Sequence, residues 1–143
     1  MILPDANLLL YAVNTDSIDH SKSLKWWQNL IESDAAVGLY TGVVFAFVRL
    51  STNRRVFAQP LTTQEAFAYL NNWLDFPAVS LIDAELEDLA TTEALLTAAG
   101  TAANLVSDAQ IAAAALRLNA TVHSADADFA RFPKVKWFNP LDR

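Results

Sequence analysis

The chain has 143 residues, of which 53% are hydrophobic and 18% charged, so it is long and apolar enough to fold as one domain spanning residues 1–143. It contains no cysteine and only two histidines, which excludes disulfides, thiol catalysis and cysteine-based zinc sites and leaves oxygen ligands for any metal ion. The net charge of −6 argues weakly against broad nucleic-acid binding, although all ten Lys and Arg residues lie at positions 22–55 or 117–143 and leave room for a local basic rim.

The first residues, MILPDANLLLYAV, carry no basic leader segment, and an Asp interrupts their apolar run. No apolar run approaches the roughly 20 residues that a membrane-spanning helix needs. These features predict a soluble cytoplasmic protein without a membrane segment.

Short apolar runs alternate with amphipathic segments along the chain. The runs predict strands at residues 1–4, 35–40, 77–81, 121–123 and 135–138, and the amphipathic segments predict helices at residues 7–13, 16–32, 42–52, 63–74, 84–98 and 104–118. Thr41 and Asp83 are predicted to cap the helices that follow them. Thr62 and Glu65 have the spacing of a capping box, and Gly100 is expected to end a helix. The alternation predicts the α/β class, with three α/β/α layers around a central, mainly parallel sheet of four to five strands.

Asp5 directly follows the first predicted strand. It can be interpreted as a helix N-cap or as a ligand at the edge of an open α/β sheet, where the sites of that architecture collect, and position alone weighs the two equally. If the first and fourth strands are neighbours, Asp5 and Asp126 emerge at the same edge. Asp108 would reach that edge from the helix before the fourth strand.

Two carboxylates follow the fourth predicted strand, and another lies in an alanine-rich helix. Asp108 is surrounded by small apolar residues, and Asp126 and Asp128 belong to the loop SADADF. Converging carboxylates repel one another unless a cation lies between them, and oxygen ligands suit Mg²⁺ or Mn²⁺. Such an ion can activate water and stabilise a phosphodiester transition state. Taken singly, each Asp is more often a cap or a turn residue than a ligand.

The cationic side chains are candidates for contact with a nucleic-acid backbone. Arg49 lies in an otherwise apolar predicted helix, and the adjacent Arg54 and Arg55 follow it. For each of these, as for Arg131 and Lys134, a solvated or ion-paired role is equally favoured. His20 is interpreted as a solvent-facing or capping residue, and the acids between residues 85 and 93 as first-turn residues favoured by the helix dipole.

Several sequence blocks resemble one known family. PDANLLLYA, NLVSDAQIAAAAL and HSADADF are similar, in order and spacing, to the three blocks of the PIN-domain ribonucleases, and most similar to the VapC-type toxins of bacterial toxin–antitoxin systems. RLSTNRRVFAQPLT and FPKVKWFNPL resemble further segments, so the likeness covers nearly the whole chain. The positions that the resemblance assigns to metal binding and catalysis are Asp5, Asp108 and Asp126, with Asp128 as a further acid, and those that support the site are Asn7, Asn104 and Ser124.

The resemblance implies a Mg²⁺- or Mn²⁺-dependent endoribonuclease, in which metal-activated water attacks an RNA phosphodiester. It also implies a homodimer and a cognate antitoxin that occludes the site. One departure is plain: the family commonly carries a glutamate a few residues before an arginine such as Arg49, and Ala46 stands at that position here. Fewer ligands predict weaker metal affinity.

Two other hypotheses remain open. The missing glutamate and the acidic net charge are compatible with a degenerate member that binds RNA or a protein without cutting. An acid-pocket phosphoryl-transfer hydrolase is ranked low, because it would need a lysine beside a nucleophilic Asp and no lysine occurs between Lys25 and Lys134.

Overall fold

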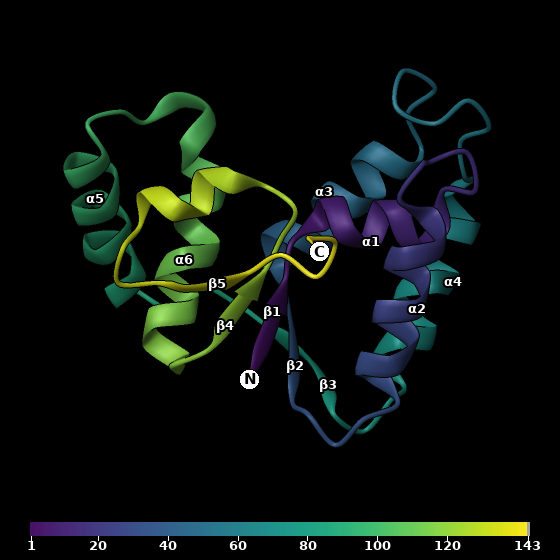
Figure 1. Cartoon of the computed structure of the whole chain (residues 1–143), viewed down its shortest axis with the longest axis horizontal. Coiled ribbons are helices and arrows are strands. Elements are labelled where there is room, and N and C mark those ends of the chain that lie inside the picture. Colours follow the sequence, from purple (N-terminus) through teal and green to yellow (C-terminus); the bar gives the residue numbers. More distant parts are fainter. Residues whose placement is uncertain (143) are drawn as a thin grey trace.

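A parallel sheet with the strand order β3-β2-β1-β4-β5 forms the centre of the fold (Figure 1). The computed structural model describes residues 1–142. The strands are β1 (Ile2–Pro4), β2 (Val37–Tyr40), β3 (Val79–Ile82), β4 (Thr121–His123) and β5 (Lys136–Phe138). Every pair of neighbouring strands is parallel, so the carboxyl ends of all five strands lie at one edge.

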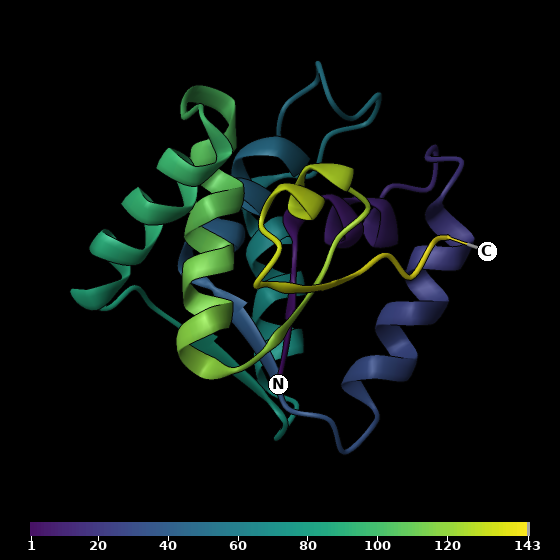
Figure 2. The same cartoon turned by 60° about the vertical axis from the view of Figure 1, so that its left-hand side comes forward.

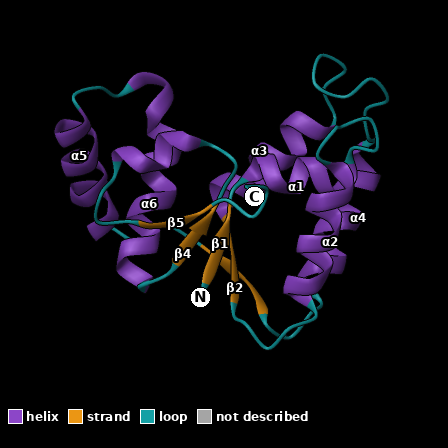
Figure 3. Cartoon of the chain, in the orientation of Figure 1, coloured by secondary structure: helices purple, strands orange, loops and turns teal. Residues whose placement is uncertain are grey.

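The helices cover both faces of this sheet. They are α1 (Ala6–Val13), α2 (His20–Ile31), α3 (Thr41–Ser51), α4 (Thr63–Leu74), α5 (Glu87–Ala99) and α6 (Val106–Leu118), with 3-10 helices η1 (Ala103–Leu105) and η2 (Ala127–Arg131). Helices α1 to α4 lie on one side of the sheet and α5 and α6 on the other, as Figures 2 and 3 show. The predicted three-layer α/β/α fold is confirmed. Within residues 1–142 every helix is too short or too polar to cross a membrane.

Small side chains let α6 lie close to the sheet. Ala109 and Ala112–Ala115 are buried against β4 and its surroundings, which include the fully buried Val122. Because alanine keeps the helix axis near the strands, the first turn of α6 reaches the carboxyl edge of the sheet.

Two predicted helix starts and one predicted cap are wrong, and side-chain hydrogen bonds explain the two starts. The helix predicted from Asp83 begins at Glu87, because the Asp83 carboxylate accepts a hydrogen bond from Thr41 Oγ1 at 2.8 Å. Thr41 is not the cap predicted for the helix that follows it, because Thr41 is the first residue of α3 and Tyr40 occupies the N-cap position. The helix predicted from residue 16 begins at His20, because the side chains of Asn14 and Ser17 accept backbone N–H groups in two turns.

Two predicted helix ends are confirmed by their cap geometry. Thr62 Oγ1 accepts from the N–H of Glu65, and the Glu65 carboxylate accepts from the N–H of Thr62, which completes the capping box. Gly100 follows α5 with a φ of 78°, a left-handed conformation that favours glycine.

Helix α5 is held by an ion pair. Asp88 is the one buried residue of this helix, and its Oδ1 accepts a hydrogen bond from Arg117 Nε of α6 at 3.1 Å. Asp88 also accepts from the N–H of Glu85 at 3.0 Å. The dipole interpretation of this acidic stretch therefore misses Asp88, whose role is to attach α5 to α6.

Replacing Asp88 with alanine should destabilise the fold by about 2 kcal/mol, because it removes a buried carboxylate that accepts hydrogen bonds from Arg117 and from the N–H of Glu85. Urea unfolding followed by circular dichroism measures the change. The matched control is Glu93→Ala, an exposed acid of the same helix, which should stay within about 0.5 kcal/mol of the wild type. Equal unfolding midpoints for both variants would contradict this role of Asp88.

Candidate functional site

The pairing of β1 with β4 creates the site. Pro4 pairs with His123, so the chain leaves both strands at the same edge of the sheet, at Asp5 and Ser124. The N–H of Asp5 donates to the carbonyl of His123 at 2.8 Å, which extends the pairing by one residue. The first and fourth strands are thus neighbours, which is the condition under which Asp5 and Asp126 emerge at the same edge.

Ser124 connects the two chain segments that meet there. Its fully buried hydroxyl donates to Asp5 Oδ2 at 2.7 Å and accepts from the N–H of Asp126 at 3.0 Å. The Nδ2 of Asn7 donates to Ser124 Oγ at 3.3 Å, and Asn7 Oδ1 accepts from the N–H of Ala125 at 3.4 Å. The structure thus brings Asn7 and Ser124 together with Asp5, as expected from the sequence.

Asp5 is a helix N-cap and also lies at the carboxyl edge of the sheet. Its Oδ1 accepts from the N–H of Ala6 at 2.8 Å, so it is the N-cap of α1. Its carboxylate is also 9% exposed and faces the acidic end of the site. Capping is confirmed, and metal binding by Asp5 stays a prediction.

Asp108, Asp126 and Asp128 form a cluster of carboxylates. Each offers one oxygen, and these three oxygens lie within 4.8 Å of one another. The N–H of Asp128 donates to Asp126 Oδ1 at 2.9 Å, which turns the chain into η2 and directs both acids to the same place. Asp5 lies outside this group of three and is connected to it through Ser124.

The negative charge of this cluster is uncompensated. Burial, and then the charges of Asp5 and Asp126, raise the pKa of Asp108 to about 7. Burial likewise raises the pKa of Asp5, against the hydrogen bonds from Ser124 and Ala6. Within residues 1–142 the one salt bridge is that of α5 with α6, so no cation pairs with the cluster. A cluster of carboxylates without a salt bridge, in which the pKa values of Asp5 and Asp108 are raised, fits a hard divalent ion such as Mg²⁺.

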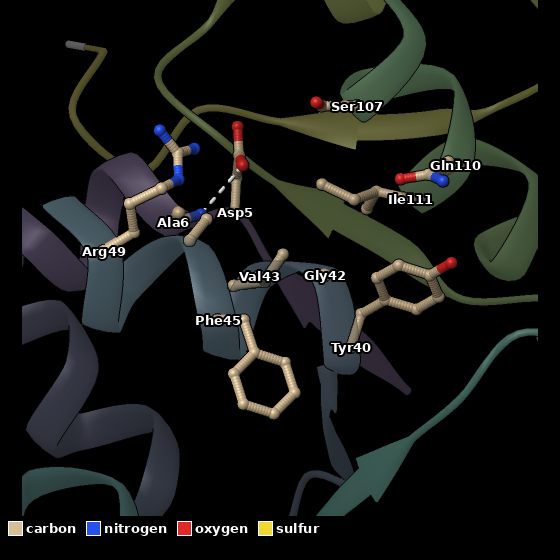
Figure 4. Close-up of a pocket in the computed structure, with 11 residues that line it drawn as sticks. Asp5, Ala6, Tyr40, Gly42, Val43, Phe45, Arg49, Ser107, Gln110 and Ile111 are labelled. Carbon is tan, nitrogen blue, oxygen red and sulfur yellow. Dashed lines mark hydrogen bonds between the residues drawn. The ribbon is translucent and has the colours of Figure 1, made fainter. Parts of the chain in front are cut away.

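A cleft of about 300 Å³ runs from Asp5 between α3 and α6 (Figure 4). Ala46 and Arg49 both line it, so the position at which the resemblance expects a glutamate lies in the same cleft as Asp5. A methyl group occupies this position instead of a carboxylate. The cleft is also lined by Tyr40, Phe45 and Gln110. The sequence analysis did not predict these residues as part of the site, because they come from three different elements. The one sequence signal is that Gln110 follows Asp108 by two residues in the same helix.

Asn104 does not lie where the sequence placed it. It was expected to begin the helix predicted over residues 104–118, but α6 begins at Val106, and Asn104 belongs to η1. The left-handed φ of 45° at Ala103 changes the chain direction before the helix. Asn104 instead lines a smaller pocket of about 170 Å³ with Asp128 and Arg131. Its supporting role stays a prediction.

Of the cationic residues predicted to contact nucleic acid, one lines the cleft and the others do not. Arg49 lines the cleft, whereas Arg54 and Arg55 are exposed in the loop after α3 and do not line it. Arg131 donates to the carbonyl of Ala99 at 3.2 Å, and Lys134 is exposed.

The two histidines have structural contacts. His20 Nδ1 lies 2.9 Å from the carbonyl of Tyr11, in agreement with a capping role. His123 accepts a hydrogen bond from Trp26 Nε1 at 3.1 Å, and burial lowers the pKa of His123 to about 4. His123 is thus neutral at pH 7, and it connects β4 with α2.

Comparison with known proteins agrees with the fold. A family model described as PIN domain matches residues 2–135. Ribonuclease VapC33 of Mycobacterium tuberculosis is 43% identical over 141 residues, which cover 99% of this chain and 99% of that protein. Ribonuclease VapC37 of the same species is 39% identical, with 98% of this chain and 97% of that protein covered. Among solved structures, VapBC2 from Rickettsia felis, bound to a DNA fragment from its promoter, has a TM-score of 0.70 at 19% identity, covering 97% of this chain and 98% of that one, which is a likeness of fold.

The metal-free protein should lose stability as the pH rises from about 4 to about 7. In this range folded Asp108 holds a proton that the unfolded chain, with a pKa of 3.8, has released. Asp108→Asn removes this repulsion and should stabilise the protein at pH 8 by on the order of 1 kcal/mol after solvent screening. The difference from the wild type should vanish near pH 4. Thermal unfolding in EDTA across this range measures it, with Glu93→Gln as control, and a pH-independent difference would refute the assignment.

Proposed function

We propose that this chain, which belongs to the PIN domain family and is a relative of the VapC ribonucleases, is a Mg²⁺- or Mn²⁺-dependent endoribonuclease toxin. The observation that carries the proposal is the meeting of Asp108, Asp126 and Asp128 next to Asp5, with none of these four acids in a salt bridge within residues 1–142. Relatives named ribonuclease that match almost the whole chain support an activity on RNA. Action in the cytoplasm stays a prediction from the sequence.

In this proposal each acid has a role that its contacts support. Asp108, Asp126 and Asp128 hold the metal ion, together with Asp5, which Ser124 and the N–H of Ala6 keep in one orientation. When bound, the ion supplies an activated water and charge stabilisation for phosphodiester hydrolysis. Arg49, which lines the cleft that begins at Asp5, binds the phosphate backbone. Arg54 and Arg55 add weaker contacts from the loop beyond α3.

A second candidate function is RNA or protein binding without cleavage. The methyl group of Ala46 in the same cleft as Asp5 favours it, since it leaves the metal with one fewer carboxylate than the family pattern. RNA binding that survives EDTA, with no cleavage under any divalent metal, would establish this alternative.

Two surfaces support the partners that the family resemblance implies. A groove of about 400 Å³ between α2 and α4, in which Tyr69 lies beside Gln28 and Glu32, is a candidate contact surface for a cognate antitoxin. On the other side of the molecule, Leu86 and Leu89 are 85% and 70% exposed at the start of α5. We propose that these leucines contact a second copy in a homodimer, which sedimentation of the free chain measures.

Purified protein should cleave RNA in the presence of Mg²⁺ or Mn²⁺ and not in EDTA. Asp5→Asn, Asp108→Asn and Asp126→Asn should each lower the rate at least about 100-fold, because each removes a negative group that holds the ion or its water. Gel analysis of a labelled RNA measures the rate, with the exposed Asp75→Asn as control. Half-maximal cleavage should need millimolar Mg²⁺ because of Ala46. Equal rates for the wild type and all three site variants would refute the proposal.

Arg49→Ala should weaken RNA binding more than Arg54→Ala combined with Arg55→Ala, because Arg49 lies in the cleft. Each lost phosphate contact should also flatten the dependence of log affinity on log salt concentration by roughly 0.7, the value for single strands. Fluorescence anisotropy of a labelled RNA in EDTA over a salt series measures both quantities. An unchanged slope for Arg49→Ala would show that this side chain does not contact a phosphate.

A further inference from the structure

The cleft beside Asp5 has two chemically different ends. Its charged lining residues are Asp5 and Arg49, which Figure 4 shows near each other. The rest of the lining is neutral and largely apolar, with the Tyr40 ring, the Phe45 side chain and the Gln110 amide. A site for phosphate alone would need no such neutral extension.

Gly42 keeps the neutral end open. A Cβ atom at this position would lie 3.0 Å from a ring carbon of Tyr40 and 3.8 Å from Gln110 Oε1. An aromatic ring and a primary amide, from different elements of the fold, therefore approach the same point above the first turn of α3. Figure 4 shows Gly42 between Tyr40 and the part of α3 that carries Phe45.

Phe45 is an unusual residue for its position. It is 58% exposed in a helix whose other aromatic residue, Phe47, is fully buried. The exposed ring lies on the rim of the cleft rather than in the core. Exposed aromatic rings beside a nuclease centre are suited to stacking with unpaired bases.

We propose that the neutral end of the cleft is a nucleobase subsite. The base next to the scissile phosphate leaves its stack and lies against Phe45 and Tyr40, while the Gln110 amide hydrogen-bonds to its edge. The phosphate stays at the charged end with Arg49. This inference rests on the proposed function and deepens it, because it assigns the contacts with one base of the substrate to Phe45, Tyr40 and Gln110.

The size and charge of the cleft favour a base over other occupants. A volume of about 300 Å³ is at the lower limit of small-molecule sites, so it suits one nucleoside and not a peptide helix. The neutral end offers no cation for a second phosphate. The Gln110 amide has both donors and an acceptor, which a base edge can pair with. A base held in a duplex cannot enter without being unpaired.

The test compares two ligands with equal backbone charge: a short labelled oligoadenylate, and a ribose-phosphate oligomer of the same length without bases. Anisotropy in EDTA measures binding without cleavage. The wild type should prefer the oligoadenylate, and Phe45→Ala should lose roughly tenfold in affinity for it while keeping its affinity for the abasic oligomer. Gln110→Ala should lose a smaller part of the preference, and Phe45→Trp should retain it.

The matched control is Phe67→Ala, which removes a ring that is 40% exposed on α4, away from the cleft. Its preference for oligoadenylate should equal that of the wild type. An equal preference in Phe45→Ala would overturn the subsite, as would a wild type that binds both ligands alike. A change in sedimentation mass of Phe45→Ala without a change in base preference would also overturn it, and would assign Phe45 to a contact with a second copy.

The same samples separate this inference from the proposed function. After Mg²⁺ is added, cleavage of the oligoadenylate tests the nuclease assignment, while the preference measured in EDTA tests the subsite. A wild type with base preference and no cleavage retains the subsite and refutes the nuclease. Cleavage without base preference does the reverse.

Discussion

The hydrogen bond from Ser124 to Asp5 joins the two strands on which the whole site depends. It is short, at 2.7 Å, and fully buried, so water cannot replace it. Because the same hydroxyl accepts from the N–H of Asp126, the orientation of Asp5 and the path of the acidic loop are fixed together. The central place of β1, between β2 and β4, holds this connection in the middle of the sheet.

The site opposes the stability of the fold that carries it. Burial and mutual repulsion raise the pKa values of Asp5 and Asp108, which means that folding brings together charges that the unfolded chain keeps apart. Apolar burial in the core offsets this unfavourable free energy, for example in the close packing of the α6 alanines against β4 near Val122. Such conflict between local energetics and the overall fold is expected at functional sites.

The sequence predicted what local patterns determine. Alternating elements predicted the layers, and the end of each strand placed Asp5 and Asp126 at one edge. The sequence did not predict individual side-chain contacts between residues that are far apart in the chain. The start of α5 depends on the bond of Asp83 to Thr41, 42 residues away, and the position of Asn104 depends on the left-handed Ala103. The neutral end of the cleft is formed by side chains from separate elements, which no single sequence window contains.

The distance along the chain between Asp5 and Ser124 has a consequence for synthesis. These residues are 119 positions apart, and Asp128 follows later still. Since β4 must emerge before it can pair with β1, a nascent chain on the ribosome carries isolated acids and no assembled site until residues 121–128 are made. A protein proposed to cut RNA thereby has no assembled site while the first 123 residues of this sequence are being translated.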